Sequence, residues 1–161
     1  MKTYTLADVV QLIDKVNKYD DEIINFGTAE DAVSDVRIKE AEKTLGLQFT
    51  TSYKDFLKNY KGGEIGYEEI FSIYNASFED HPAGDIVHKN LYHRKHGFAT
   101  LEQLVVSRTD FGETFYFDYT QFQDGECPLY VKIPSGASHY YASNFYEFLC
   151  KRIKDHAGED S

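Results

Sequence analysis

Three histidines lie close together in the middle of the chain, and they are the first residues whose type and spacing suggest chemistry. His88, His93 and His96 fall within nine positions, and His93 and His96 share a face if this segment is helical. A metal site needs three or four ligands held in place by a second layer of hydrogen bonds. Neither a cysteine nor a pair of carboxylates lies beside these histidines. We therefore interpret them as polar surface residues, with a metal or small-molecule site as the alternative.

The two cysteines, Cys127 and Cys150, are too few for a disulfide framework or a metal cluster. Cys127 precedes a proline and closely follows Asp124 and Glu126. Because burial and neighbouring carboxylates raise the pKa of a thiol, we expect Cys127 to be a poor nucleophile and a reduced structural residue.

No motif in the sequence indicates a catalytic site of another kind. The chain lacks the G-x-S-x-G pattern of a serine nucleophile, and Gly62, Gly63 and Gly66 fit neither of the common phosphate-binding patterns. Carboxylates are numerous, but no pair stands out as a general acid and base. The sequence therefore predicts a protein that is not an enzyme and that carries no cofactor and no metal.

The charge of the chain favours a protein partner over a nucleic acid. Its formal net charge is −10, with 27 acidic and 17 basic residues. An acidic surface repels phosphate backbones, so direct binding of nucleic acid is disfavoured, whereas a basic protein is attracted. Two segments, 19–35 and 110–126, contain acidic but no basic residues, and a mildly basic segment, 36–61, lies between them. The alternative is that this charge serves only solubility.

The length and the hydropathy of the chain indicate one folded domain. Its 161 residues include 13 Tyr and 12 Phe, which supply much of the expected core. No apolar run approaches the length of a membrane span, and the first ten residues lack the apolar stretch of a signal peptide. We expect a single domain over residues 1–161, with 155–161 as a polar tail, and the cytoplasm as its location.

Two short helices closed by a glycine turn form the centre of the expected fold. Ile38, Ala41 and Leu45 recur at helical spacing and Gly46 follows at once, where a left-handed turn ends a helix. Residues 50–52 offer caps for a second helix with an apolar stripe, and Lys61-Gly62-Gly63 ends it, since glycine takes positive φ without steric cost.

The remaining elements predict an α+β fold with a largely antiparallel sheet, flanked by N-terminal helices and a C-terminal helix. One helix begins after Thr5 and ends near residue 19, one follows Asp85 and ends near residue 97, and one follows residues 143–144. Residues 20–34 are expected to form a loop or a brief strand, and residues 75–83 a loop. Strands are expected at residues 69–74, which we take as the first strand of the sheet, and at 104–107, 113–119, 128–133 and 139–142.

The central stretch EAEKTLGLQFTTSYKDFLKNYKGGE resembles the core motif of the SUKH superfamily of immunity proteins and cell-wall regulators. A second resemblance is the strand from Gly112-Glu113 to Asp118, followed by Asp124-Gly125-Glu126-Cys127-Pro128. Bacterial members typically inhibit a polymorphic or contact-dependent toxin, often a nuclease, that is encoded beside them. Fungal members are interaction hubs in cell-wall signalling. The resemblance thus implies an immunity protein for a cognate toxin, and the alternative is a non-enzymatic regulatory interaction module.

On this reading the partner-binding residues are acidic and lie in loops or at strand ends. They are Glu64, Glu68, Glu69, Asp110, Glu113, Asp124 and Glu126. Tyrosine-containing segments such as 67–69 and 139–141 supply residue types suited to an interface. Tyr53, Phe56, Leu57, Gly62 and Gly63 match the family motif and are expected to be structural. The expected state is a monomer or a weak homodimer that binds neither nucleic acid nor a membrane.

Overall fold

The computed structural model describes residues 3–31, 33–73 and 84–158. The helices are α1 (Leu6–Tyr19), η1 (Ala29–Asp31), α2 (Asp35–Leu45), α3 (Thr51–Tyr60), α4 (Ile86–Lys95), η2 (Tyr119–Gln121) and α5 (Phe145–Ala157). The strands are β1 (Ile24–Phe26), β2 (Gly63–Ile65), β3 (Glu68–Ile70), β4 (Gln103–Arg108), β5 (Thr114–Asp118), β6 (Leu129–Lys132) and β7 (Ser138–Ala142). Within these residues, each helix is too short or too polar to cross a membrane.

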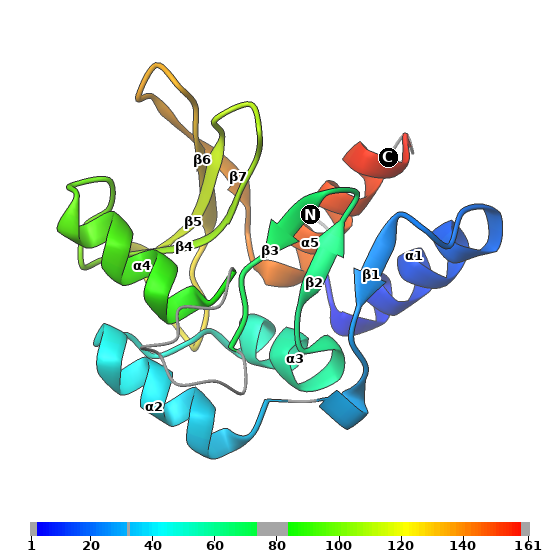
Figure 1. Ribbon diagram of the computed structural model, residues 1–161, viewed down its shortest axis with the longest axis horizontal. Helices are drawn as coiled ribbons and strands as arrows, with labels where there is room; N and C mark the ends of the chain where they lie inside the picture. Colours follow the sequence, from blue (N-terminus) through cyan, green and yellow to red (C-terminus); the bar gives the residue numbers. More distant parts are fainter. Residues whose placement is uncertain (1–2, 32, 74–83, 159–161) are drawn as a thin grey trace.

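The strands form one antiparallel sheet in which every strand lies beside its neighbour in sequence, in the order β1 to β7. Two parts of this sheet meet at a weak joint, where β3 and β4 pair only through Ile70 and Ser107. Beyond the joint, the side chain of Asn90 in α4, rather than a neighbouring strand, pairs with the backbone of β4. Its side-chain amide donates to the carbonyl of Val105 at 2.9 Å and accepts from the Val105 N–H at 2.7 Å. In this way α4 is fixed to the exposed edge of β4 (Figure 1).

The sequence predicts the end of α2 at Gly46 and a cap for α3 among residues 50–52, and the structure agrees with both. Ser34 caps α2 and Thr50 caps α3, each accepting a hydrogen bond from a backbone N–H one turn on. Gly46 ends α2 in the left-handed conformation. The end of α3 differs from the prediction, because Lys61, not a glycine, takes the positive φ of 62°.

The two glycines after α3 are needed for close packing. A Cβ atom on Gly63 would lie 2.0 Å from the carbonyl oxygen of Asn25 in β1. A Cβ atom on Gly62 would lie 2.5 Å from the Cβ of Ser72. Both distances are shorter than any side chain allows, so these glycines let the chain pass between β1 and the segment that follows β3.

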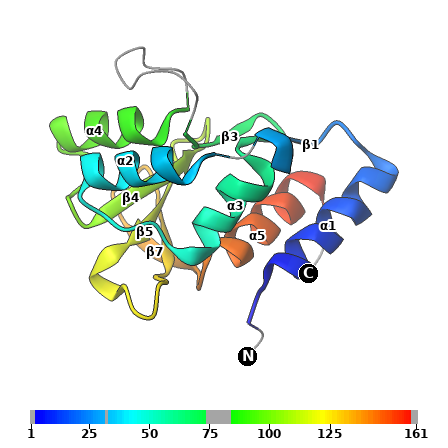
Figure 2. The ribbon, with the colours of Figure 1, turned by 90° about the horizontal axis from the view of Figure 1, so that it is seen from below.

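The core is an aromatic cluster beneath the sheet. α3 lies between the α2–α4 pair and the α5–α1 pair, and it packs on α5 (Figure 2). The ring centroid of Phe145 in α5 lies 5.0 Å from that of Tyr53 and 5.2 Å from that of Phe56, both in α3. Phe117 of β5 stacks on Phe145 from the sheet at 5.7 Å. These four rings are almost completely buried and join both layers of the fold.

The fold class and the four C-terminal strands agree with the sequence prediction, and two details do not. Glu68–Ile70 is the third strand of the sheet, not the first, because the three-residue strands β1 and β2 precede it. The predicted loop 75–83 lies outside the described residues. At the C-terminus, α5 continues through Asp155 to Ala157, where Gly158 ends it, so the start of the expected polar tail is helical.

Candidate partner-binding site

Two hairpin turns carry the most exposed large hydrophobic side chains in the described part of the chain. Tyr67, in the β2–β3 turn, is 95% exposed, and Phe111, in the β4–β5 turn, is 85% exposed. The two turns border a pocket of about 510 Å³. We call Gly66, Tyr67, Thr109, Asp110 and Phe111 the hairpin-tip surface.

Both turns are fixed to the body of the protein. The N–H of Gly66 donates to the carbonyl of Ile23 at 2.7 Å, and a Cβ atom on Gly66 would lie 2.7 Å from the ring of His156 in α5. In the other turn, the N–H of Thr109 donates to the carbonyl of Glu113 at 2.9 Å. The Thr109 hydroxyl accepts from the N–H of Glu113 at 3.2 Å. The exposed rings are therefore held on ordered backbone.

A buried ion pair forms the floor of the pocket between the two turns. The Glu68 and Arg152 side chains are 2% and 6% exposed, and the guanidinium donates to both carboxylate oxygens. The Ser107 hydroxyl donates to Glu68 Oε2 at 2.6 Å, and His156 Nε2 lies 2.9 Å from Oε1. Burial acts to raise the pKa of Glu68, but the hydrogen bonds and charge of Arg152, with those of His156 and Ser107, hold it below the ordinary value.

The position of Glu68 corrects the sequence-based prediction that it contacts a partner. Its side chain is buried and both of its oxygens accept hydrogen bonds from within the protein. The physical reason is the alternation of side chains along the chain at β3. Glu68 points inward toward α5, whereas its sequence neighbours Tyr67 and Glu69 do not. Glu68 therefore orders the pocket floor and is not available to a partner.

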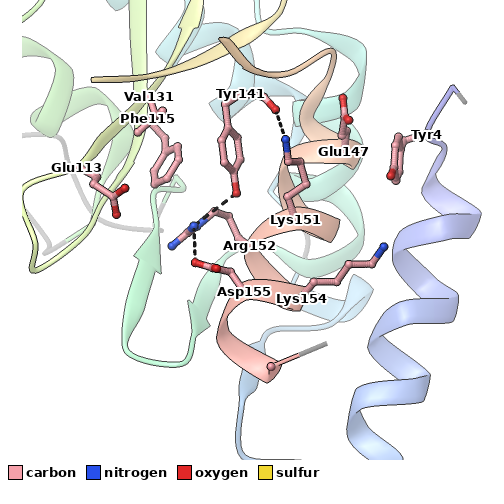
Figure 3. A pocket seen from close by; sticks show the side chains of 11 residues that line it. Tyr4, Glu113, Phe115, Val131, Tyr141, Glu147, Lys151, Arg152, Lys154 and Asp155 are labelled. Atoms are coloured by element: carbon pink, nitrogen blue, oxygen red, sulfur yellow. Dashed lines mark hydrogen bonds and ion pairs between the residues drawn. The ribbon is translucent and has the colours of Figure 1, made fainter. Parts of the chain in front are cut away.

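A second hollow continues from this pocket along α5. It measures about 650 Å³ and shares Glu113, Arg152 and Asp155 with the first pocket. Figure 3 shows its walls, with Glu113 and Phe115 on the sheet facing the charged side chains of α5. We call the two pockets together the α5 groove.

Hydrogen bonds and a cation–π contact order the groove wall that α5 forms. Arg152 donates to Asp155 at 3.1 Å and to the Tyr141 hydroxyl at 3.4 Å, and its guanidinium lies 4.6 Å from the centre of the Phe115 ring. Lys151 donates to the carbonyl of Tyr141 at 2.6 Å, so α5 is also tied to β7. The groove is thus a preformed surface with both acidic and basic side chains.

Three of the other predicted residues gather around the hairpin tips. Glu69 and Asp110 line a further pocket of about 620 Å³, which shares Tyr67 with the α5 groove. Glu113 lines the groove itself. Glu64 is exposed and lies directly opposite Glu69 in the β2–β3 ladder, so their side chains share one face of the hairpin.

The last two predicted residues, Asp124 and Glu126, lie in the loop at the opposite end of β5. Asp124 is exposed, whereas Glu126 is half-buried and accepts hydrogen bonds from the Ser52 N–H at 2.8 Å and the Ser52 hydroxyl at 2.7 Å. Burial raises the pKa of Glu126, and the hydrogen bonds from Ser52 oppose that rise. Glu126 thus anchors the start of α3 and lies apart from the hairpin-tip surface.

His93 and Cys127, two of the residues whose type suggested chemistry, lie in environments that indicate a structural role. His93 is buried, which corrects its interpretation as a surface residue, and its Nδ1 lies 2.7 Å from the carbonyl of Lys89. Burial is the main cause that lowers its pKa. Burial, with the charges of Glu126 and Asp118, raises the pKa of Cys127 to about 12. Among the described residues, no group of three His, Cys, Asp or Glu side chains could hold a metal ion.

The family of the protein follows from residues 35–149. This segment matches a family model described as SMI1-KNR4 cell-wall, and it runs from α2 into α5, through both hairpins of the candidate site. The chain belongs to the SUKH superfamily. Members of this superfamily are generally non-catalytic immunity or regulatory proteins. None of the curated proteins compared with this SUKH chain matches it significantly.

Sequence reasoning about this SUKH chain missed three residues of the site. Phe111 had a readable signal, since a phenylalanine inside a short hairpin turn has little to pack against. Arg152 and His156 had a weaker signal, because the clearest sequence feature of their helix is its apolar stripe and neither residue belongs to it. Their partner Glu68 is 84 positions away from Arg152, so the ion pair depends on how α5 meets β3.

Proposed function

We propose that this SUKH protein is an immunity protein that binds a cognate bacterial toxin and neutralises it by occlusion. The proposed contact surface is the hairpin-tip surface with the adjoining α5 groove. The observation that carries the proposal is the exposure of Tyr67 and Phe111 on two fixed turns beside a preformed groove.

The two rings have the properties of binding anchors. Aromatic side chains bury large area with few rotatable bonds, and they dominate the binding energy of many protein interfaces. Each is nearly fully exposed here, although burying such a side chain is worth roughly 1.5–3 kcal/mol. A partner that covers both turns would gain this contribution, and would pay little entropy because the turns are already ordered.

The charge around the anchors supports a basic partner, such as a nuclease domain acting in the cytoplasm. Glu64 and Glu69 lie directly opposite each other in the β2–β3 ladder and place two carboxylates on one face of the hairpin. Asp110 and Asp155 are exposed beside the two rings. With a net charge of −10, the whole molecule would also attract a basic toxin and speed the encounter.

A pull-down from the native cell tests this proposal. The tagged protein and a Tyr67→Ala/Phe111→Ala variant would be incubated with lysate in parallel, and the retained proteins identified by mass spectrometry. We expect a stoichiometric toxin domain on the unaltered protein, partly released by high salt, and its loss from the variant. Retention of a signalling protein instead would favour the regulatory alternative. Equal retention of a toxin by both proteins would exclude this contact surface.

A further inference from the structure

A small basic pocket lies on the face of the sheet that carries the C-terminal part of α4. It measures about 230 Å³ and its walls include His93, Arg108, Thr114 and Lys132, with Gly112 and Gly136 from two hairpin turns. None of the residues that line it is acidic. This composition is unexpected in a chain with a net charge of −10.

The strand register brings the polar groups together. Arg108 of β4 pairs with Thr114 of β5, and Thr114 pairs with Lys132 of β6. Directly paired residues of an antiparallel sheet point to the same face, so the three side chains form a row across three strands. The backbones of Arg108 and Lys132 are thus two strand spacings, or about 10 Å, apart. At this separation their long side chains can converge above Thr114.

Among the described residues, the groups in this row have no partners. Arg108 and Lys132 occur in none of the ion pairs found there, and the Thr114 hydroxyl occurs in none of the hydrogen bonds. Asp110 lines a neighbouring pocket with Arg108 but forms no ion pair with it. Within this part of the chain, two cations and a hydroxyl group are therefore available to a ligand.

The ring of His93 lines the same pocket and lies close to the same positive charges. Burial is the largest cause that lowers its pKa, and the Lys89 carbonyl opposes it. The charges of Arg108, Lys89 and Lys132 lower it further. Three cations thus act on one buried ring, and a bound anion would offset their mutual repulsion.

We propose that this pocket binds a phosphate group, held between Arg108 and Lys132 and hydrogen-bonded by the Thr114 hydroxyl. Guanidinium and ammonium groups pair strongly with phosphate oxygens, and the fork of Arg108 suits a tetrahedral oxyanion. The volume of about 230 Å³ suits a free phosphate ion or the phosphate end of a small phosphate monoester. Lys132 and Thr114 line neither pocket of the α5 groove, whereas Arg108 lines both this pocket and the groove pocket between the hairpin turns, so the two sites adjoin at Arg108.

An NMR titration of the full chain tests the site. Inorganic phosphate, phenyl phosphate and malonate would each be added at constant ionic strength while the amide signals of Gly112, Thr114 and Gly136 are followed. We expect saturable shifts with phosphate, confined to these residues and their neighbours. Tighter binding of phenyl phosphate than of inorganic phosphate would indicate a monoester ligand, and equal affinity for the two would indicate the free ion. Saturation by malonate with equal affinity would overturn the assignment to phosphate.

Variants make this test specific. Lys132→Gln and Thr114→Val should each weaken phosphate binding, the former by about tenfold, as expected for one lost charge-assisted hydrogen bond. Lys95→Gln removes the same charge from an exposed position of α4 outside the pocket and should leave binding unchanged. Non-saturable shifts, or the same affinity in Lys132→Gln as in Lys95→Gln, would overturn the proposal. Unchanged amide dispersion in each variant would show that it is folded.

Discussion

Glu68 and Arg152 show how a buried ion pair can order a binding surface from below. Their side chains are almost fully buried, yet every carboxylate oxygen has a donor, from Arg152, His156 or Ser107. Removing one partner of such a pair leaves an uncompensated charge in the interior. The pair therefore fixes the β2–β3 turn against α5, and with it the position of Tyr67.

We predict that Glu68→Gln lowers the free energy of unfolding by about 3–5 kcal/mol at neutral pH, because Arg152 stays buried without its counter-charge. The pKa of Glu68 is lowered in the folded protein, so its contribution is complete above the ordinary glutamate value of about 4.3. It is lost as the pH falls through the lower folded value. Urea melts at several pH values would therefore show the difference from the unaltered protein shrinking below about pH 4.

The matched control for this variant is Glu64→Gln, at an exposed position of the same hairpin. It should change the free energy of unfolding by less than about 0.5 kcal/mol. Equal effects of the two substitutions, or an effect of Glu68→Gln that does not change with pH, would refute the role of the ion pair.

Phe56 is a second residue with a measurable contribution. It is 1% exposed and its ring contacts those of Phe26, Tyr53 and Phe145. We predict that Phe56→Ala lowers the free energy of unfolding by about 3–5 kcal/mol through the cavity it leaves. Denaturant melts measure this directly, and a loss below about 1 kcal/mol would remove Phe56 from the core.

At the scale of elements, the junction between α3 and β2 determines how closely β1 can pack against β2. Gly63 combines a φ of 142° with a backbone oxygen 2.0 Å from the place of a Cβ atom. Gly46, at the end of α2, also has positive φ but has open space around it. A comparison of substitutions at Gly46 and Gly63 therefore distinguishes the free-energy cost of the backbone conformation from the free-energy cost of close packing.

We predict that Gly46→Ala lowers the free energy of unfolding by about 1–2 kcal/mol, the cost of the left-handed conformation alone. Gly63→Ala should lose about 1–3 kcal/mol more, because β1 has to move away from β2. Thermal or urea melts of both variants provide the comparison. Equal losses would show that the contact with Asn25 does not limit this position.

The elements that could be predicted from the sequence are those specified by local signals. Gly46 marks the end of α2, residues 50–52 offer a cap for α3, and the structure confirms both signals, with Thr50 as the cap. The strands β1 and β2 have three residues each, too few for a periodic pattern, and were therefore missed or left open.

The candidate site was predictable only in part for a related reason. Charge and residue type led to the prediction of Glu69, Asp110 and Glu113 as partner-binding residues, and the structure places these three near the two hairpin turns. The burial of Glu68 and the role of Glu126 depend on residues 84 and 74 positions away, respectively. No local pattern records such contacts, so these two carboxylates could not be distinguished from surface residues by sequence alone.

At the scale of the whole molecule, the SUKH fold presents two adjoining surfaces of different chemistry. The hairpin tips and the α5 groove display exposed aromatic rings with carboxylates nearby, and they suit a basic protein. The small pocket beside α4 contains cations and no carboxylate, and it shares Arg108 with the groove. Because Lys132 and Thr114 lie outside the groove, substitutions at these two positions test the pocket without altering the groove.

The most direct measurement of the central claim is a neutralisation assay with the toxin that the proposal assigns to this protein, sought in the product of the neighbouring gene. Growth of cells that express that toxin would be measured with the unaltered protein, with Tyr67→Ala/Phe111→Ala, and with Tyr140→Ala. Tyr140 is 58% exposed on β7 and lines neither pocket of the α5 groove, so it controls for the loss of an exposed ring. Melting temperatures would confirm that all three proteins are folded.

We predict that the unaltered protein and Tyr140→Ala restore growth, and that the double variant fails because it loses the two anchors of the interface. Full protection by the double variant would contradict the proposed contact surface. Absence of protection by the unaltered protein, at levels that exceed those of the toxin, would contradict the immunity function itself.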